Sequence, residues 1–278
     1  MKHLQLYLPL LAALGSGCSA QTGDLTLTTY GEEFIEVGMP PASESSPEGV
    51  VDGWSITYDS FLIVLADIEL ADEDIPMIGD AQARVFDMTQ AGPHQILRLQ
   101  QVPAGNLSQV QVSTRPAADA VAGNATAEQV QRMTTQGWSV FAQGKAERAG
   151  ITKTFAWGFE LGTRYRNCKD ADEISGLVVP TGGSVQAEFT IHGDHLFFDD
   201  LQDPSAVMRF DAIAAADADM DGEVTLSELE AVDLATLPSD QYGTGGDGRV
   251  LDLAHFIRDQ TRSLVHFAGE GHCQAETL

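Results

Sequence analysis

Basic residues are scarce in this sequence. It has 15 lysines and arginines against 41 aspartates and glutamates, which gives a formal net charge of −26. Binding to nucleic acid or to an anionic membrane surface through bulk charge depends on positive side chains. We therefore expect no nucleic-acid partner, and the acidity suits a protein that holds cations.

The sequence also lacks the local motifs of several enzyme classes. It contains no zinc-protease helix motif, no phosphate-binding loop and, outside the N-terminal signal, no Gly-x-Ser-x-Gly nucleophile elbow. Sites assembled from distant residues leave no such trace. We expect a non-enzymatic protein, and an undetected hydrolase is the alternative.

The first 17 residues are typical of an export signal. One lysine, Lys2, precedes an apolar run over residues 4–14, and small residues follow before Cys18. The run is too short to be kept as a membrane span. The four residues 15–18 resemble the lipobox of bacterial lipoproteins, although that family usually has an aliphatic residue where Gly15 stands.

The lipobox resemblance implies that Cys18 is acylated and anchors the mature chain in a membrane. Simple secretion after a nearby cut is the alternative. Ser19, in place of an aspartate after the cysteine, implies an outer-membrane or cell-surface lipoprotein, with the periplasm as second choice.

Cysteine is scarce as well, with three in the chain. If Cys18 carries lipid, Cys168 and Cys273 remain as an even pair in an oxidising compartment. We expect them to form a disulfide that ties the C-terminus to the middle of the chain; two free thiols are the alternative.

Composition divides the exported chain into three parts. Residues 18–50 include a Pro-, Ser- and Glu-rich stretch at 40–49 without apolar periodicity, which indicates a tether and an extended, mobile linker. Residues 51–200 are mostly short apolar runs with turn signals between them. Residues 201–278 carry helical patterns.

The middle part predicts an antiparallel β-sandwich. Strands are expected over residues 54–58, 61–70, 83–88, 95–101, 108–114, 138–148, 151–161, 176–180 and 184–191, with a short helix over 127–133. Many short strands joined by polar turns are typical of a sandwich. Phe155, Trp157 and Phe159 form a stripe at period two, which favours a buried core over a binding cleft.

Residues 217–228 have the composition of a calcium loop. Asp217, Asp219 and Asp221 stand at the first, third and fifth places, Gly222 at the sixth and Glu228 at the twelfth. The loop resembles the EF-hand family. That resemblance implies further ligation by the backbone carbonyl of Glu223 at the seventh place and by Thr225 at the ninth, and a glycine turn at the sixth. The alternative is an acidic turn before a helix, with Glu228 completing a capping box with Thr225.

Helical patterns flank this loop, so residues 201–278 are expected to form an EF-hand-like subdomain. A second loop centred on Asp247 and Gly248 has one carboxylate and cannot hold calcium. We interpret it as a degenerate partner whose Val250 pairs with Val224, followed by a helix over 251–267. One calcium ion is predicted, with a structural role, because calcium is abundant outside the cytoplasm.

Two histidines close to the end of the last expected strand suggest a transition-metal site. His192 and His195 are followed or flanked by carboxylates, and His94, His266 or His272 would have to supply a third ligand for copper or zinc. The alternative is two turn residues that form ordinary hydrogen bonds.

A second resemblance concerns the order of the β-rich segments. Residues 52–70, 97–105, 154–160 and 189–193 are similar in order to the methanobactin-associated periplasmic copper-binding proteins. The resemblance implies a β-sandwich, while the copper ligands of that family do not map onto this chain. A protein or small-molecule partner is not evident from the sequence.

Overall fold

The structure is a computed structural model of the 278-residue chain, and it describes residues 21–278. The expected signal peptide over 1–17 and the expected lipid attachment at Cys18 lie outside the described residues. Within residues 21–278, no helix combines the length and the apolar character needed to cross a membrane.

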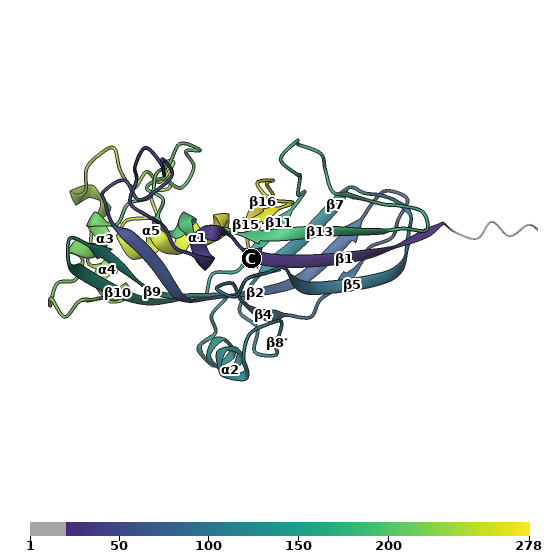
Figure 1. Cartoon of the computed structure of the whole chain (residues 1–278), viewed down its shortest axis with the longest axis horizontal. Coiled ribbons are helices and arrows are strands. Elements are labelled where there is room, and N and C mark those ends of the chain that lie inside the picture. Colours follow the sequence, from purple (N-terminus) through teal and green to yellow (C-terminus); the bar gives the residue numbers. More distant parts are fainter. Residues whose placement is uncertain (1–20) are drawn as a thin grey trace, which may run out of the picture.

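The chain is mainly β, as expected, and most strands belong to one curled sheet (Figure 1). This larger sheet has ten strands. Seven follow one another in the spatial order β14 (Glu223–Val224), β10 (Ile151–Phe159), β9 (Val140–Arg148), β2 (Ser55–Ala71), β7 (Gln109–Thr114), β11 (Thr163–Arg166) and β16 (Gln274–Thr277). Beside them, β3 (Ile78–Asp80) and β4 (Arg84–Asp87) pair with β2, and β8 (Val121–Ala122) pairs with β4. The segments expected at 54–58 and 61–70 together form the long strand β2.

A second sheet holds four strands in the order β15 (Val265–Phe267), β13 (Ser184–Ile191), β1 (Thr22–Gly31) and β5 (His94–Pro103). β1 runs parallel to β13 and antiparallel to β5. A two-stranded ribbon pairs β6 (Gly105–Leu107) with β12 (Leu177–Val179), so part of the turn expected at 103–106 is a short strand.

The helices are short. They are α1 (Glu33–Glu36), α2 (Ala127–Gln136), α3 (Asp211–Ala215), α4 (Leu226–Glu230) and α5 (Leu253–Gln260), with 3₁₀ turns η1 (Asp194–Phe197), η2 (Leu234–Thr236) and η3 (Thr261–Ser263). Figure 1 shows α1, α3, α4 and α5 gathered near the β9–β10 hairpin, while α2 projects on another side. The helix expected over 251–267 ends at Gln260, and its remainder forms η3 and β15.

Residues 21–50, the described part of the segment expected to be a tether and linker, belong to the fold. Leu25 and Leu27 in β1 are almost completely buried, and alternate residues of this strand face the core. The loop that follows turns back on itself, because Ser43 and Ser46 exchange backbone hydrogen bonds and Val50 donates to Pro40. Hydrogen bonding to strands far away in the sequence satisfies a backbone that local composition presents as a linker.

One hydrophobic core joins the three expected parts. It contains Leu25 from β1, Phe155 from β10, Phe210 before α3 and Phe256 from α5. The aromatic stripe is confirmed as core, since Phe155, Trp157 and Phe159 are at most 3% exposed. The region after residue 200 therefore packs on the β-rich region as a continuous body.

Candidate metal centres

The acidic loop lies between α3 and α4 and brings three of its carboxylates together. Oxygens of Asp217, Asp219 and Glu228 all lie within 4.8 Å of one another. Gly222 has φ +92°, the left-handed conformation that glycine adopts without strain, and it allows the sharp turn. Asp217 is 6% exposed, whereas Asp219 is on the surface.

Hydrogen bonds within the loop leave one buried carboxylate oxygen without a partner. Asp217 Oδ2 accepts from the backbone N–H of Gly222 at 3.0 Å, while Asp217 Oδ1 is buried and has no hydrogen bond. Asp219 accepts from the N–H of Asp221, which in turn accepts from the N–H of Glu223 at 2.7 Å. The loop backbone is thus folded by its own side chains, with Asp217 Oδ1 left free to bind a cation.

Glu228 closes the loop and also caps α4. Its Oε2 accepts from the N–H of Thr225 at 2.9 Å, and Thr225 Oγ1 accepts from the N–H of Glu228 at 3.3 Å. Its Oε1 accepts from the N–H of Ala218 at 3.1 Å. The capping box expected as an alternative is therefore present, and its carboxylate still faces Asp217 and Asp219.

Of the six residues predicted as calcium ligands, the structure gathers the side chains of three. Asp221 uses a carboxylate oxygen in the turn to Glu223. Glu223 was expected to act through its carbonyl, and its side chain is exposed. Thr225 donates its hydroxyl to Glu228 Oε2 at 2.8 Å.

Strand β10 holds the loop in place, which the sequence did not predict. Val224 pairs with Phe155 in a parallel ladder, and the expected pairing with Val250 is wrong, because Val250 lies instead in the turn that precedes α5. Trp157 Nε1 donates to the carbonyl of Val224 at 2.8 Å. The loop has a sheet strand as its partner where an EF-hand pair would have a second loop.

Lys153 on β10 supplies a positive charge to the loop. Its ammonium group forms an ion pair with Asp217, and the Asp217 side chain is fully buried. The hydrogen bond from Lys153, followed by that from Gly222, lowers the pKa of Asp217 below its ordinary value. The first carboxylate of the loop is accordingly ionised at neutral pH, and Lys153 compensates part of its charge.

A second group of metal-binding side chains consists of histidines. His192 directly follows β13, His195 lies in η1, and His266 lies in β15 opposite Thr190. One ring nitrogen of each lies within 4.8 Å of the others. The ring centroids of His192 and His266 are 3.8 Å apart, and each lies about 5 Å from that of His195.

The structure selects one of the three histidines proposed as a third ligand. His266 joins His192 and His195, whereas His94 on β5 bonds to the carbonyl of Gln90. The exposed ring of His272 lies 4.9 Å from the ring of His266. His192 and His266 are 3% and 8% exposed, so both are core residues. The alternative of turn residues with ordinary hydrogen bonds concerned His192 and His195, and His195 does lie in the turn η1 and bonds to Ser263.

Carboxylates surround this histidine cluster. Glu32 accepts from His192 Nδ1 at 2.7 Å, and Glu32, His192 and Glu270 form a further group with ligand atoms within 4.8 Å. Glu32 was missed because it falls in the expected linker, and no local pattern there signals a ligand. Burial, together with the charge of Glu32, raises the pKa of Asp194 to about 7.

Burial also affects the histidines themselves. It lowers the pKa of His195 to about 3 and that of His266 to about 2, and the neighbouring His192 acts in the same direction. Both imidazoles are therefore neutral at physiological pH, which is the form that binds metal ions.

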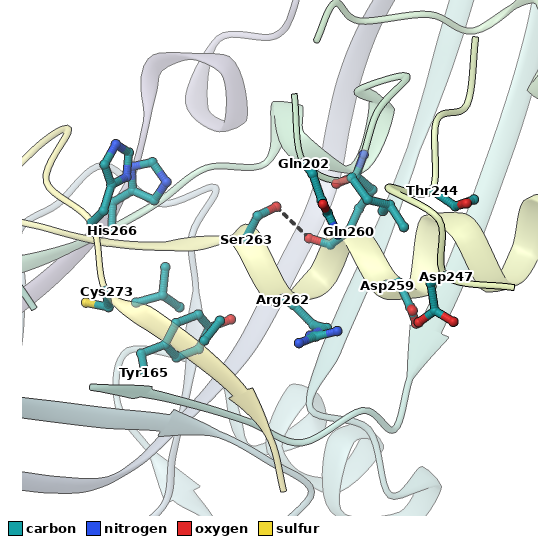
Figure 2. A pocket seen from close by; sticks show the side chains of 14 residues that line it. Tyr165, Gln202, Thr244, Asp247, Asp259, Gln260, Arg262, Ser263, His266 and Cys273 are labelled. Atoms are coloured by element: carbon teal, nitrogen blue, oxygen red, sulfur yellow. Dashed lines mark hydrogen bonds between the residues drawn. The ribbon is translucent and has the colours of Figure 1, made fainter. Parts of the chain in front are cut away.

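Two cavities reach the cluster. One, of about 520 Å³, is lined by both polar and apolar side chains, and Figure 2 shows His266 at one end of it and Asp247 and Asp259 at the other, with Ser263 and Gln260 between them. The other is lined by Glu32, His192, Asp194, His195 and Glu270 among others. The histidine cluster is thus buried but close to solvent.

The predicted disulfide is confirmed. Cys168 and Cys273 are bonded, with a sequence separation of 105. The bond fixes the turn after β15, which carries Glu270 and His272, to the segment after β11.

Comparison of this chain with family models, with curated proteins and with solved structures finds no match.

Proposed function

We propose that this protein is an extracytoplasmic binding module that holds one calcium ion in the loop of residues 217–228. The observation that carries the proposal is Asp217 Oδ1, a buried carboxylate oxygen without a hydrogen bond, in a carboxylate that lies within 4.8 Å of oxygens of Asp219 and Glu228. Calcium takes several oxygen ligands from flexible loops of this composition. An ion would give the unpaired oxygen a partner and neutralise the remaining carboxylates.

The role that we propose for the ion is structural. The loop is attached to β10 through Val224, and β10 belongs to the main sheet. Binding would therefore stabilise the packing of α3 and α4 against the sheet. Where calcium is near millimolar, even a weak site stays occupied, which favours a permanent stabilising ion over a sensor.

The same proposal includes an attachment of the protein to a membrane through Cys18 and a non-enzymatic role. Acylation of Cys18 would place the module on the outer membrane or cell surface, or in the periplasm. We expect replacement of Cys18 by alanine to release the protein into the soluble fraction. An alanine variant that still sediments with membranes and carries the lipid mass would contradict this anchor.

Calorimetry and thermal unfolding test the calcium site. Chelator-treated wild-type protein should bind one calcium ion, and calcium should raise its melting temperature. Glu228→Gln should weaken binding at least tenfold, because it removes a ligand charge while glutamine still completes the capping box. Glu230→Gln is the matched control, since Glu230 ends the same helix α4 and is exposed. Absence of calcium binding and of any chelator effect in the wild type would overturn the proposal.

A further inference from the structure

Three imidazoles from two parts of the chain meet at one place, with His192 and His195 close together in sequence and His266 about 70 residues later. His192, His195 and His266 follow or belong to three different elements, and each offers a ring nitrogen within 4.8 Å of the other two. None of these residues belongs to the acidic loop. The cluster is therefore a separate set of metal-binding atoms, and its properties do not depend on the calcium proposal.

Hydrogen bonds fix which nitrogen of His192 carries the lone pair. Its Nδ1 lies 2.7 Å from Glu32, whose carboxylate can only accept, so the proton is on Nδ1. In the neutral ring Nε2 of His192 carries the lone pair, and this atom is buried and without a hydrogen bond. A histidine that donates one N–H to a carboxylate and presents the other nitrogen is the arrangement typical of metal ligands.

The same reasoning settles His195. The hydroxyl of Ser263 donates its hydrogen to the carbonyl of Gln260 at 2.8 Å, as Figure 2 shows. Ser263 Oγ can therefore only accept from His195 Nδ1, which lies 3.0 Å away. This leaves the lone pair of His195 on Nε2.

His266 supplies the third nitrogen. Its Nδ1 is buried and has no hydrogen-bond partner among the described residues. Leaving buried polar atoms unpaired costs about 1–3 kcal/mol each. Histidines that serve only as packing residues would have these nitrogen atoms paired. His192 Nε2 and His266 Nδ1 are instead both buried without a hydrogen bond, and the centroids of the two rings are 3.8 Å apart.

We propose that His192, His195 and His266 bind one zinc or copper(II) ion. Three neutral imidazoles suit these borderline ions, and both are preferred by nitrogen sites over the other abundant divalent metals. With metal–nitrogen distances of about 2.0–2.1 Å, two ligands of one ion are at most about 4.2 Å apart, so small side-chain movements complete the site. Glu32 acts as a positioning residue that orients His192 and raises its basicity.

A metal ion bound by these three histidines has an open coordination position. Three protein ligands leave a fourth place for water or for an exchangeable side chain. Glu270 and His272 lie on the exposed turn after β15, next to the cluster. An ion could therefore enter or leave from this side, which suits a protein that carries or stores the metal.

Metal titration of untagged, chelator-treated protein tests the site. Zinc and copper(II) are added in separate calorimetric experiments, with electron paramagnetic resonance for copper. One ion per chain is expected, with binding at least tenfold weaker in His266→Gln and in His195→Gln. Tight binding of zinc alone, of copper alone or of both supports the site and identifies the ion.

Two controls keep the result interpretable. His94→Gln changes a histidine that bonds only to Gln90 on the other side of β1, and it should bind the metal like the wild type. Glu32→Gln should weaken binding about 10- to 100-fold and change the copper signal, as expected for a residue that orients a ligand. Circular dichroism and urea unfolding of each variant report that it is folded.

Failure of the two proposals is distinguishable. No stoichiometric zinc or copper in wild-type protein overturns the histidine site, as does binding that survives both His195→Gln and His266→Gln. Loss of calcium binding in Glu228→Gln with zinc or copper binding retained would show that the two sites are independent.

Discussion

Trp157 donates its indole N–H to the carbonyl oxygen of Val224 at 2.8 Å, and this bond joins the aromatic core of the larger sheet to the acidic loop. Both residues are completely buried. Val224 also pairs with Phe155, so the centre of the loop behaves as an additional edge strand of the sheet. The loop geometry therefore depends on the core, and a change in the core should reach the loop.

Replacement of Trp157 by phenylalanine tests this dependence. The substitution keeps an aromatic ring but removes the donor to the buried Val224 carbonyl, so we expect a stability loss of about 1–3 kcal/mol and weaker calcium binding. Urea unfolding and calorimetry measure the two effects. Trp138→Phe is the control, because Trp138 stacks on Phe141, outside the loop. Equal effects of the two substitutions on calcium affinity would contradict the coupling.

Lys153→Met should bind calcium more tightly than the wild type. The ammonium group of Lys153 pairs with Asp217, so it competes with an incoming cation for the same carboxylate. Removing one competing charge is expected to increase affinity by about fivefold, which corresponds to about 1 kcal/mol. Without calcium the variant should be less stable, because the buried carboxylate loses its partner.

Lys145→Met provides the comparison for this prediction. Lys145 lies on the neighbouring strand β9 and pairs with Glu147 at the surface, where both side chains are more than 40% exposed. Its removal should leave calcium affinity unchanged. Weaker calcium binding by Lys153→Met would mean that the lysine supports the loop geometry more than it competes for Asp217.

The acidic loop and most strands were readable because their signals are local. The ligand types at residues 217–228 follow one another within twelve positions, and the β9–β10 hairpin shows its alternation on both sides of one turn. The attachment of Val224 to β10 was not readable, since the partner residue is about 70 positions earlier. A strand edge accepts any backbone, so sequence carries little information about which one it pairs with.

The pairing of β1 and the composition of the histidine cluster were not predicted for the same reason, because both depend on partners far away in the sequence. Thr26 and Thr28 alternate with leucines in a short β-prone run, but the parallel partner β13 lies about 160 residues later. Spacing could identify His192 and His195 as candidates and could not select His266 over His94. Only the placement of β15 beside β13 brings His266 to them.

Removal of the disulfide should destabilise the protein strongly. The bond between Cys168 and Cys273 spans 105 residues, and closing a loop of about 100 residues in the unfolded chain corresponds to about 4.7 kcal/mol. We expect the double variant Cys168→Ser, Cys273→Ser to lose several kcal/mol in urea unfolding. Reducing agent should lower the stability of the wild type to a similar degree. Reducing agent should leave the stability of the double variant unchanged. An equal loss of stability in the wild type and the double variant would show that the reducing agent does not act through this disulfide.

The stability of the metal-free protein should fall as the pH falls from about 6.5. His195 and His266 have lowered pKa values in the folded state, so the unfolded chain takes up protons on these groups first. Each contributes stability that is complete above about pH 6.5 and decreases by up to about 1.4 kcal/mol per pH unit below it. Other ionisable groups beside them are His192, His272, Glu32, Glu270 and Asp194.

Asp194 acts in the opposite direction. Its pKa is raised to about 7 in the folded state, so between about pH 4 and 7 the folded chain holds a proton that the unfolded chain has lost. In this range the proton uptake by one histidine on unfolding offsets the proton release by Asp194. The second histidine then sets the net pH dependence of the free energy of unfolding. His195→Gln removes one of the two histidines, so the free-energy difference between wild type and variant should shrink by up to about 1.4 kcal/mol per pH unit from pH 6.5 to 4. Urea unfolding with chelator at four pH values measures this difference, in which the many other carboxylates cancel. Parallel pH curves for the two proteins would show that His195 is not held neutral in the fold.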